Sequence, residues 1–198
     1  MTKIKEILIG TNNNGKYKEI SDLLPKNIKK YSPIDFNIKS PEEDGKTFKD
    51  NSLIKAAYFS KKTNLICISD DSGLEIDLLD GKPGIHSARW GGPESNFDLA
   101  IKKVFHEIKK IKKNWKQNEI TARFVCSLTI YWPEGKNHTT QGVVNGTISE
   151  KAKGEKGFGY DPIFIPNGFK NTFGEMNIEK KMLIDHRFKA YAQLKKFI

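Results

Sequence analysis

A nine-residue stretch, Ile66-Cys-Ile-Ser-Asp-Asp-Ser-Gly-Leu74, constrains the fold of this chain more than any other segment. Its apolar, β-branched start predicts a buried strand, and Gly73 predicts a turn directly after it. Two adjacent acids, Asp70 and Asp71, end that strand. Two carboxylates are costly to remove from water unless a cation or several donors face them. The stretch therefore predicts an acid/base or metal role, since Asp clusters suit Mg²⁺ and Mn²⁺, with a capped turn as the alternative.

Length and composition are those of a protein that can bury a core. The 198 residues, 37% hydrophobic and 11% aromatic, suit one large domain or one domain with a small appended lobe. No apolar run approaches a membrane span, and the first residues lead into a strand pattern instead of a secretory signal. Cys67 and Cys126 lie in expected strands, without metal-ligand spacing. These features predict a cytoplasmic protein with two reduced thiols.

The net charge of +10 comes from lysine. Of 34 basic residues only three are Arg, namely Arg89, Arg123 and Arg187. A dedicated nucleic-acid surface mixes Arg and aromatic residues in one patch, whereas these Lys are spread along expected helices and loops. The charge therefore favours a solvated surface, with a basic nucleic-acid binder as the alternative and weak polyanion binding left open.

The chain begins with an expected strand at residues 4–9, a Gly-containing loop, and a helix from Lys16 to Leu24. In this context, backbone N–H groups and a helix N-terminus bind phosphate. The spacing Gly10-x-x-x-x-Gly15-Lys16 satisfies most of a P-loop, but Tyr17 stands where a Mg²⁺-binding Ser or Thr is required. The loop therefore predicts a polar-ligand site, with a plain turn or a P-loop kinase or NTPase as alternatives.

Helix and strand patterns alternate along the middle of the chain. Thr47 is the expected N-cap of a helix that runs to about Lys62. Its expected inner side carries Phe48, Leu53, Ile54, Ala57 and Tyr58, while Asn51 and Lys55 lie four apart on another face. The other expected elements are an edge strand within 31–40, a strand at 74–79, a helix at 95–115 capped by Ser95, a hairpin of 120–132 and 139–149, and a short strand at 163–166.

Glycine is densest in the segment 153–162. Three glycines surround Phe158 and Tyr160, and Asp161 follows. Two aromatic rings on a permissive backbone predict a site where a flat base stacks, with a core-plugging loop as the alternative.

The chain ends with a short helical piece near 175–183 and a final helix to about Phe197. Asp185 is its expected N-cap, which places His186 and Arg187 in the first turn. Cations there oppose the helix dipole, so they point to an anionic or carbonyl-rich ligand.

Five of these motifs, taken in order, resemble the inosine triphosphate pyrophosphatase family, also called Ham1-like or RdgB-like. Each motif alone is weak, but the resemblance covers essentially the whole chain. The motifs are Thr11-Asn-Asn-Asn-Gly-Lys16, Ser69-Asp-Asp-Ser-Gly-Leu74, Pro83-Gly-Ile-His-Ser-Ala-Arg89, Gly157-Phe-Gly-Tyr-Asp-Pro162 and Lys181 with His186-Arg187.

The resemblance implies a single domain over residues 1–198 with an elongated, two-lobed α/β fold. A long mixed β-sheet flanked by helices and a nucleotide cleft between the lobes belong to that expectation. The resemblance also implies a cytoplasmic homodimer that needs Mg²⁺. Its substrates would be purine nucleoside triphosphates, namely ITP, dITP and XTP, hydrolysed to the monophosphate and pyrophosphate. This reaction removes noncanonical purines from the nucleotide pool, without a membrane or a specific nucleic acid as partner.

The same resemblance assigns roles to individual residues. Asp71 would accept a proton from water and contact the metal. Glu43 would be the second metal carboxylate, with Glu42 as the neighbouring alternative and the role of Asp70 left open. The substrate-binding residues would be Thr11, Asn12, Asn13, Asn14, Gly15, Lys16, Ser72, Phe158, Gly159, Tyr160, Asp161, Lys181, His186 and Arg187.

A side chain that only donates hydrogen bonds, such as that of Arg187, would prefer some purine bases over others. Inosine and xanthosine present a 6-oxo acceptor, whereas adenine presents a 6-amino donor, so Arg187 can bond the first and not the second. The chain departs from the family pattern at Asp185, where a small hydroxyl residue is frequent, and at Trp90, where Tyr or Phe is common. Neither departure touches the acid pair.

Overall fold

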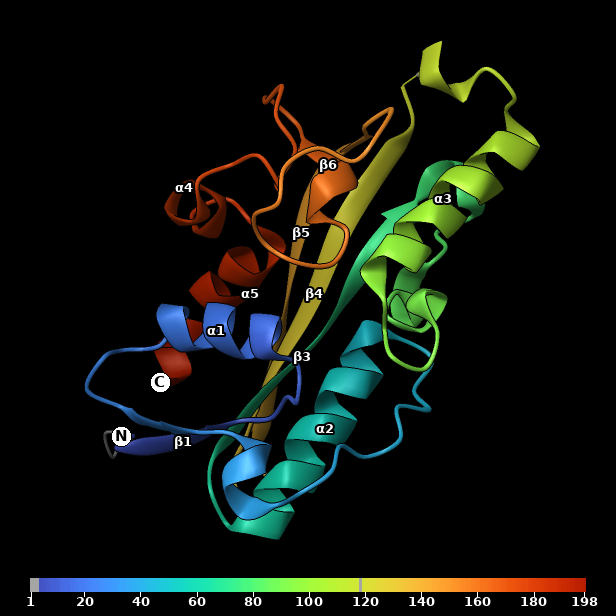
Figure 1. Ribbon diagram of the computed structural model, residues 1–198. Helices are drawn as coiled ribbons and strands as arrows, with labels where there is room; N and C mark the ends of the chain where they lie inside the picture. The colour runs from blue at the N-terminus through green and yellow to red at the C-terminus, as the bar shows by residue number, and fades with distance from the viewer. Residues whose placement is uncertain (1–3, 118) are drawn as a thin grey trace. The chain divides into compact units, whose positions relative to one another are not determined.

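The structure, a computed structural model, describes residues 4–117 and 119–198 and contains one six-stranded mixed sheet (Figure 1). The strand order is β2-β1-β3-β4-β5-β6. β1 pairs in parallel with both β2 and β3, and β5 pairs antiparallel with β6. The strands are β1 (Glu6–Ile9), β2 (Lys29–Tyr31), β3 (Cys67–Ile76), β4 (Thr121–Tyr131), β5 (Asn137–Ile148) and β6 (Phe164–Pro166). The α/β class with a mixed sheet is therefore confirmed.

Five α-helices accompany the sheet in the described residues. They are α1 (Asn14–Leu23), α2 (Phe48–Thr63), α3 (Phe97–Ile111), α4 (Ile178–Met182) and α5 (His186–Leu194). The predicted cap of α2 is confirmed, because the Thr47 hydroxyl accepts a hydrogen bond from the Asp50 amide and the Asp50 carboxylate accepts one from the Thr47 amide. No helix among the described residues is long and apolar enough to cross a membrane.

The chain divides into two compact units. Unit 1 comprises the residues up to Asp71, Cys126–Gly142 and His186–Ile198. Unit 2 comprises Ser72–Val125 and Val143–Asp185. The division falls within β3, so the two halves of this strand belong to different units.

Unit 1 has two apolar clusters. In one, α1 packs beside α5 (Figure 1), and the buried side chains include Ile7, Ile9, Ile20, Leu128 and Leu194. The other joins α2 to the sheet through Leu8, Ala56, Phe59 and Cys67. These clusters hold β1 and the first half of β3 in place, and the loop of residues 11–16 begins just after β1.

Unit 2 is built around the apolar stripe of α3. Its inner face buries Ala100, Ile101, Val104 and Ile108, spaced three and four residues apart. Phe124, Phe164 and Phe173 form a contacting aromatic group in the same core. The loop of residues 153–162 closes over this core through Tyr160.

The prediction that Gly73 ends the central strand is wrong. β3 continues to Ile76, so Asp70 and Asp71 lie in mid-strand and residues 74–79 do not form a second strand. Leu74 and Ile76 are fully buried in the core of unit 2, and this alternation keeps the chain extended. A glycine within a strand is compatible with close backbone packing as well as with a turn.

Three smaller predictions also need correction. The edge strand expected within 31–40 is β2, which ends at Tyr31, because Pro33 begins a 3₁₀ turn capped by Ser32. Asn96 caps α3 in place of Ser95, which has φ 51°, and the helix ends at Ile111. The inner face of α2 buries a different set from the one expected, namely Phe48, Asn51, Ser52, Lys55, Ala56, Phe59 and Ser60.

Candidate functional site

The first loop of unit 1 presents the N-terminus of α1. Thr11 accepts a hydrogen bond from the Asn13 amide, and the Asn13 side chain caps the helix by accepting one from the Lys16 amide. The first N–H groups of a helix have no partner inside it, so the amides of Asn14 and Gly15 are oriented to receive an anion. Asn12 instead bonds Ser40. The loop of residues 11–16 thus leads into a capped helix N-terminus, and phosphate binding by this loop stays a prediction.

Asp70 is fully buried and surrounded by cations. Its Oδ2 atom accepts from Arg187 Nε at 3.1 Å and Nη2 at 3.0 Å, and Lys16 Nζ lies 3.5 Å away. Its other oxygen, Oδ1, has no hydrogen-bond partner among the described residues. Arg187 is itself buried, and its Nη1 donates to Glu19. Asp70 therefore links the first residues of α5 to Lys16 on α1.

Asp71 meets a different set of partners, supplied mainly by α2. Asn51 Nδ2 donates to its Oδ2 atom at 3.1 Å, and Lys55 Nζ lies 3.8 Å from Oδ1. Lys55 also pairs with Glu43 at 2.9 Å, and Asn51 accepts from the Gly45 amide at 2.9 Å. One turn of α2 thus connects the acidic loop of residues 41–45 to Asp71.

The two neighbouring carboxyls have pKa values that move in opposite directions. Burial alone would raise the pKa of Asp70, but Lys16, Arg187 and Lys55 outweigh it and hold that pKa well below its usual range. Burial raises the pKa of Asp71, and Lys55 and Lys16 only partly oppose it. Two acids whose environments separate their pKa values are suited to different roles, one as a fixed charge and one as a proton acceptor.

The charged side chains around Asp70 and Asp71 have an excess of negative charge, which a divalent cation would offset. Four carboxylates, those of Glu19, Glu43, Asp70 and Asp71, face three cations, those of Lys16, Lys55 and Arg187. Within residues 4–117 and 119–198, no group of three or more His, Cys, Asp or Glu side chains forms a metal cage. Mg²⁺ is usually bound by one or two carboxylates with water and substrate phosphates, so Asp71 and Glu43 fit Mg²⁺ and do not fit an all-protein site. Glu42 is exposed, which favours Glu43 of the two predicted candidates.

The sequence placed Asn51 and Lys55 on a face of α2 other than its expected inner side, but the structure buries both beside Asp71. The signal that identifies them is their four-residue spacing directly after an acidic loop, which puts both on one side of a helix. Glu19 was also missed, and only its contact with Arg187 identifies it.

The glycine-rich loop of unit 2 is organised by Asp161. Its Oδ2 atom accepts from the Phe158 amide at 2.8 Å and from Lys181 Nζ at 2.6 Å. Lys181 is also 5.4 Å from the centre of the Phe158 ring. Gly157 and Gly159 have φ values of 74° and 69°, and a Cβ at Gly157 would collide with Asp161. The loop thus fixes one ammonium group and one half-buried ring side by side.

Tyr160 differs from the exposed, stacking ring that the sequence suggested. It is 2% exposed, its hydroxyl donates to the Ser87 carbonyl at 2.8 Å, and its ring packs edge-on against Phe97. Burial raises the pKa of this hydroxyl. Tyr160 therefore anchors the loop to the core of unit 2, while Phe158 keeps a half-exposed ring.

The remaining predicted residues divide between the units. Ser72 is half-buried on β3 at the start of unit 2. His186 is buried in the first turn of α5 in unit 1, beside Arg187, and Asp185 directly precedes that helix. The structure therefore brings the loop of residues 11–16, the acid pair, Glu43 and Arg187 together in unit 1, and brings Phe158, Asp161 and Lys181 together in unit 2.

We expect Lys181→Met to lower the free energy of unfolding by about 3–5 kcal/mol, because the buried carboxylate of Asp161 loses its paired cation. Urea unfolding of the full chain measures this loss. Lys180→Met is the matched control, since Lys180 is exposed and lies over the Phe169 ring, and it should cost less than about 1 kcal/mol. Equal losses in the two variants would show that the pair does not hold the loop.

Comparison with known proteins identifies the family. The sequence matches the Ham1 family over residues 7–197. It is 40% identical over 189 residues to a dITP/XTP pyrophosphatase of Rhodospirillum centenum, covering 95% of this chain and 92% of that protein. It is also 40% identical over 201 residues to a Bacillus subtilis protein of the same name, covering 100% and 99%. Among solved structures, a HAM1 protein from Coxiella burnetii aligns with a TM-score of 0.86 at 31% identity, covering 98% of both chains. A Staphylococcus aureus Ham1 protein aligns with 0.83 at 33% identity, covering 98% and 97%. The chain belongs to the Ham1 family.

Proposed function

We propose that this chain is a pyrophosphatase that hydrolyses the noncanonical purine nucleotides dITP, XTP and ITP to the monophosphate and pyrophosphate. Similar proteins are named dITP/XTP pyrophosphatases, among them a solved structure from Mycobacterium abscessus. The observation that carries the proposal is the pair Asp70 and Asp71, adjacent on one strand with pKa values moved apart. Such a pair provides a fixed negative charge next to a carboxylate suited to accept a proton.

The proposed reaction breaks the anhydride bond between the α and β phosphates. Asp71 accepts a proton from the attacking water, whose oxygen forms the new bond to phosphorus, while pyrophosphate leaves. Lys16 and the first amides of α1 bind the phosphate chain. Asp71 and Glu43 are the residues that would hold Mg²⁺, which neutralises phosphate charge when it is bound. Lys55 keeps these two carboxylates near each other.

The side chains proposed to bind the purine base can donate hydrogen bonds but cannot accept them. Lys181 and Arg187 are donor-only, so a 6-oxo purine can pair with them and a 6-amino purine cannot. Phe158 is the ring on which the base would stack, and Asp161 and Tyr160 hold its loop in place. Arg187 is oriented by Asp70 and Glu19, which prevents its guanidinium from turning to suit another base.

We further propose that residues 1–198 act as one functional domain in a cytoplasmic homodimer. The family match extends from residue 7 to residue 197, so both compact units belong to the matched region.

A nucleotide screen tests the proposed activity. The purified chain is incubated with ITP, dITP, XTP, ATP and GTP, and pyrophosphate is measured as the phosphate that appears only when an inorganic pyrophosphatase is added. We expect release from ITP, dITP and XTP in preference to ATP. Orthophosphate without pyrophosphatase, or transfer to an acceptor, would instead support the P-loop kinase or NTPase alternative. Salt-dependent DNA or RNA binding without hydrolysis would support the nucleic-acid alternative.

Removal of the metal should abolish turnover of ITP. Because four carboxylates face three cations before any triphosphate binds, a further polyanion needs added positive charge. We expect EDTA to stop pyrophosphate release and Mg²⁺ in excess to restore it. Undiminished activity in EDTA would exclude Mg²⁺ as the required cofactor.

A further inference from the structure

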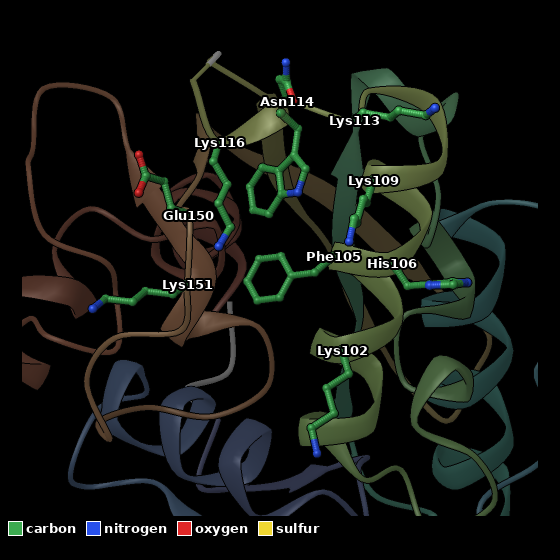
Figure 2. A pocket seen from close by; sticks show the side chains of 10 residues that line it. Lys102, Phe105, His106, Lys109, Lys113, Asn114, Lys116, Glu150 and Lys151 are labelled. Carbon is green, nitrogen blue, oxygen red and sulfur yellow. The ribbon is translucent and has the colours of Figure 1, made fainter.

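A second basic site lies in unit 2, among residues that the proposed reaction does not use. The last turns of α3, the 3₁₀ turn that begins at Trp115, and the segment after β5 line a pocket of about 680 Å³ (Figure 2). This volume lies within the roughly 300–1,000 Å³ that is usual for small-molecule sites. Five lysines and one acid contribute to its wall, namely Lys102, Lys109, Lys113, Lys116, Lys151 and Glu150.

The lysines of this pocket differ from other lysines of α3 in their interactions. Among residues 4–117 and 119–198, none of the five forms an ion pair with a carboxylate. Two other lysines of α3, outside the pocket, do have partners: Lys110 pairs with Glu107 at 2.8 Å, and Lys103 lies 4.8 Å from the Trp90 ring. Five lysines and Glu150 therefore give the pocket four more positive than negative charges.

General lysine richness does not account for this concentration. Seven of the fifteen residues 102–116 are Lys, against 31 of 198 in the whole chain. Lys102 and Lys109 are seven residues apart, which places them along one side of α3, and Lys113 follows two residues after the end of that helix. Lys116 and Lys151 come from other segments, so cations reach the pocket from more than one wall.

Two aromatic side chains give the pocket an apolar part. Phe105 stacks on the buried Trp115 with ring centres 5.3 Å apart. Figure 2 shows the ammonium groups of Lys109 and Lys116 on either side of the Phe105 ring, whereas the carboxylate of Glu150 points away from it. The five lysines are exposed, and the repulsion between their ammonium groups is relieved when an anion binds between them.

We propose that this pocket binds a chain of two or more linked phosphates, such as pyrophosphate or the phosphate tail of a nucleotide. Such a chain carries roughly three to four negative charges at neutral pH, which matches the four excess positive charges of the pocket. A pocket of this volume has no room for a nucleic-acid duplex, which favours a small ligand. The site is separate in residues from the loop of residues 11–16, the acid pair and Lys181.

Calorimetric titration of the full chain with inorganic tripolyphosphate, at low salt and without divalent metal, tests this proposal. The double variant Lys109→Gln/Lys116→Gln should bind at this site at least about tenfold more weakly, a change of about 1.4 kcal/mol. Lys103→Gln/Lys110→Gln removes the same amount of charge from positions of α3 outside the pocket and should bind as the parent does. Turnover of ITP should be unchanged in both, which shows that both are folded. Equal binding by the two double variants would overturn the proposal.

Parallel titrations identify the source of the phosphate chain. Pyrophosphate or ATP binding that is lost only in Lys109→Gln/Lys116→Gln would support the proposal and name the ligand. Orthophosphate binding as tightly as tripolyphosphate would overturn it in favour of a single-anion site. Loss of binding to a single-stranded oligonucleotide, with tripolyphosphate binding intact, would overturn it in favour of an extended nucleic-acid surface.

Discussion

Asp71→Asn should reduce the rate of pyrophosphate release from ITP by a factor of roughly 10²–10⁴, because general-base catalysis contributes about that much. Asn keeps the size of the side chain and can still bond Asn51, but it cannot accept a proton at neutral pH. Steady-state release of pyrophosphate from ITP with saturating Mg²⁺ measures the change. Asp77→Asn is the control. The carboxylate of Asp77 accepts a hydrogen bond from the Thr121 hydroxyl and has no role in the proposed reaction, so this variant should retain activity. Normal turnover in Asp71→Asn would refute the assignment of Asp71 as the base.

The same substitution should leave the fold at least as stable as before. Burial raises the pKa of Asp71, so the ionised group destabilises the native state at pH values above that raised pKa. A neutral Asn removes this penalty, and the melting temperature should stay equal or rise. In the parent, kcat/KM for ITP should fall on the acid side at a pH above the ordinary Asp pKa of about 3.9. A strongly lowered melting temperature in Asp71→Asn would mean that lost activity reports unfolding.

Arg187→Ala should lower the free energy of unfolding by about 3–5 kcal/mol and erode the preference for ITP over ATP. Arg187 and Asp70 are both buried, and removal of one partner leaves an uncompensated charge. The preference should fall at least about tenfold, since a lost charge-assisted hydrogen bond is worth roughly 1.5–3 kcal/mol. Urea unfolding and the ratio of kcat/KM for ITP to that for ATP measure the two effects separately.

A second variant distinguishes base recognition from stability. In Asp70→Asn/Arg187→Met the buried charge is removed together with its partner, so much of the lost stability should return while the preference for ITP stays low. An unchanged preference in a folded double variant would exclude Arg187 from base recognition. The lowered pKa of Asp70 adds a pH signature. Its stabilising contribution is fully present above the unfolded pKa and is lost as pH falls through the lower folded pKa, so this dependence should disappear in the double variant.

Local physical chemistry made several features of this chain predictable. The cap at Thr47, the hairpin strands β4 and β5, and the strand–loop–helix start follow from hydrophobic period and capping residues, and all three are present. The acid pair could be singled out because charges in an apolar run are costly unless they are used. The order of five short motifs was sufficient for the family.

The sequence determined which residue types carry the chemistry, because a buried carboxylate pair and a glycine-rich loop are costly in any fold. The tertiary structure alone decided their partners. Asn51 and Lys55 have the sequence pattern of a solvated pair until α2 packs against β3, and Arg187 lies 117 residues from the Asp70 that it binds. Tyr160 similarly lies in the core of unit 2, where its hydroxyl donates to the Ser87 carbonyl and its ring packs against Phe97. Contacts between distant segments depend on which faces are buried together, and hydrophobic period within one segment contains no such information.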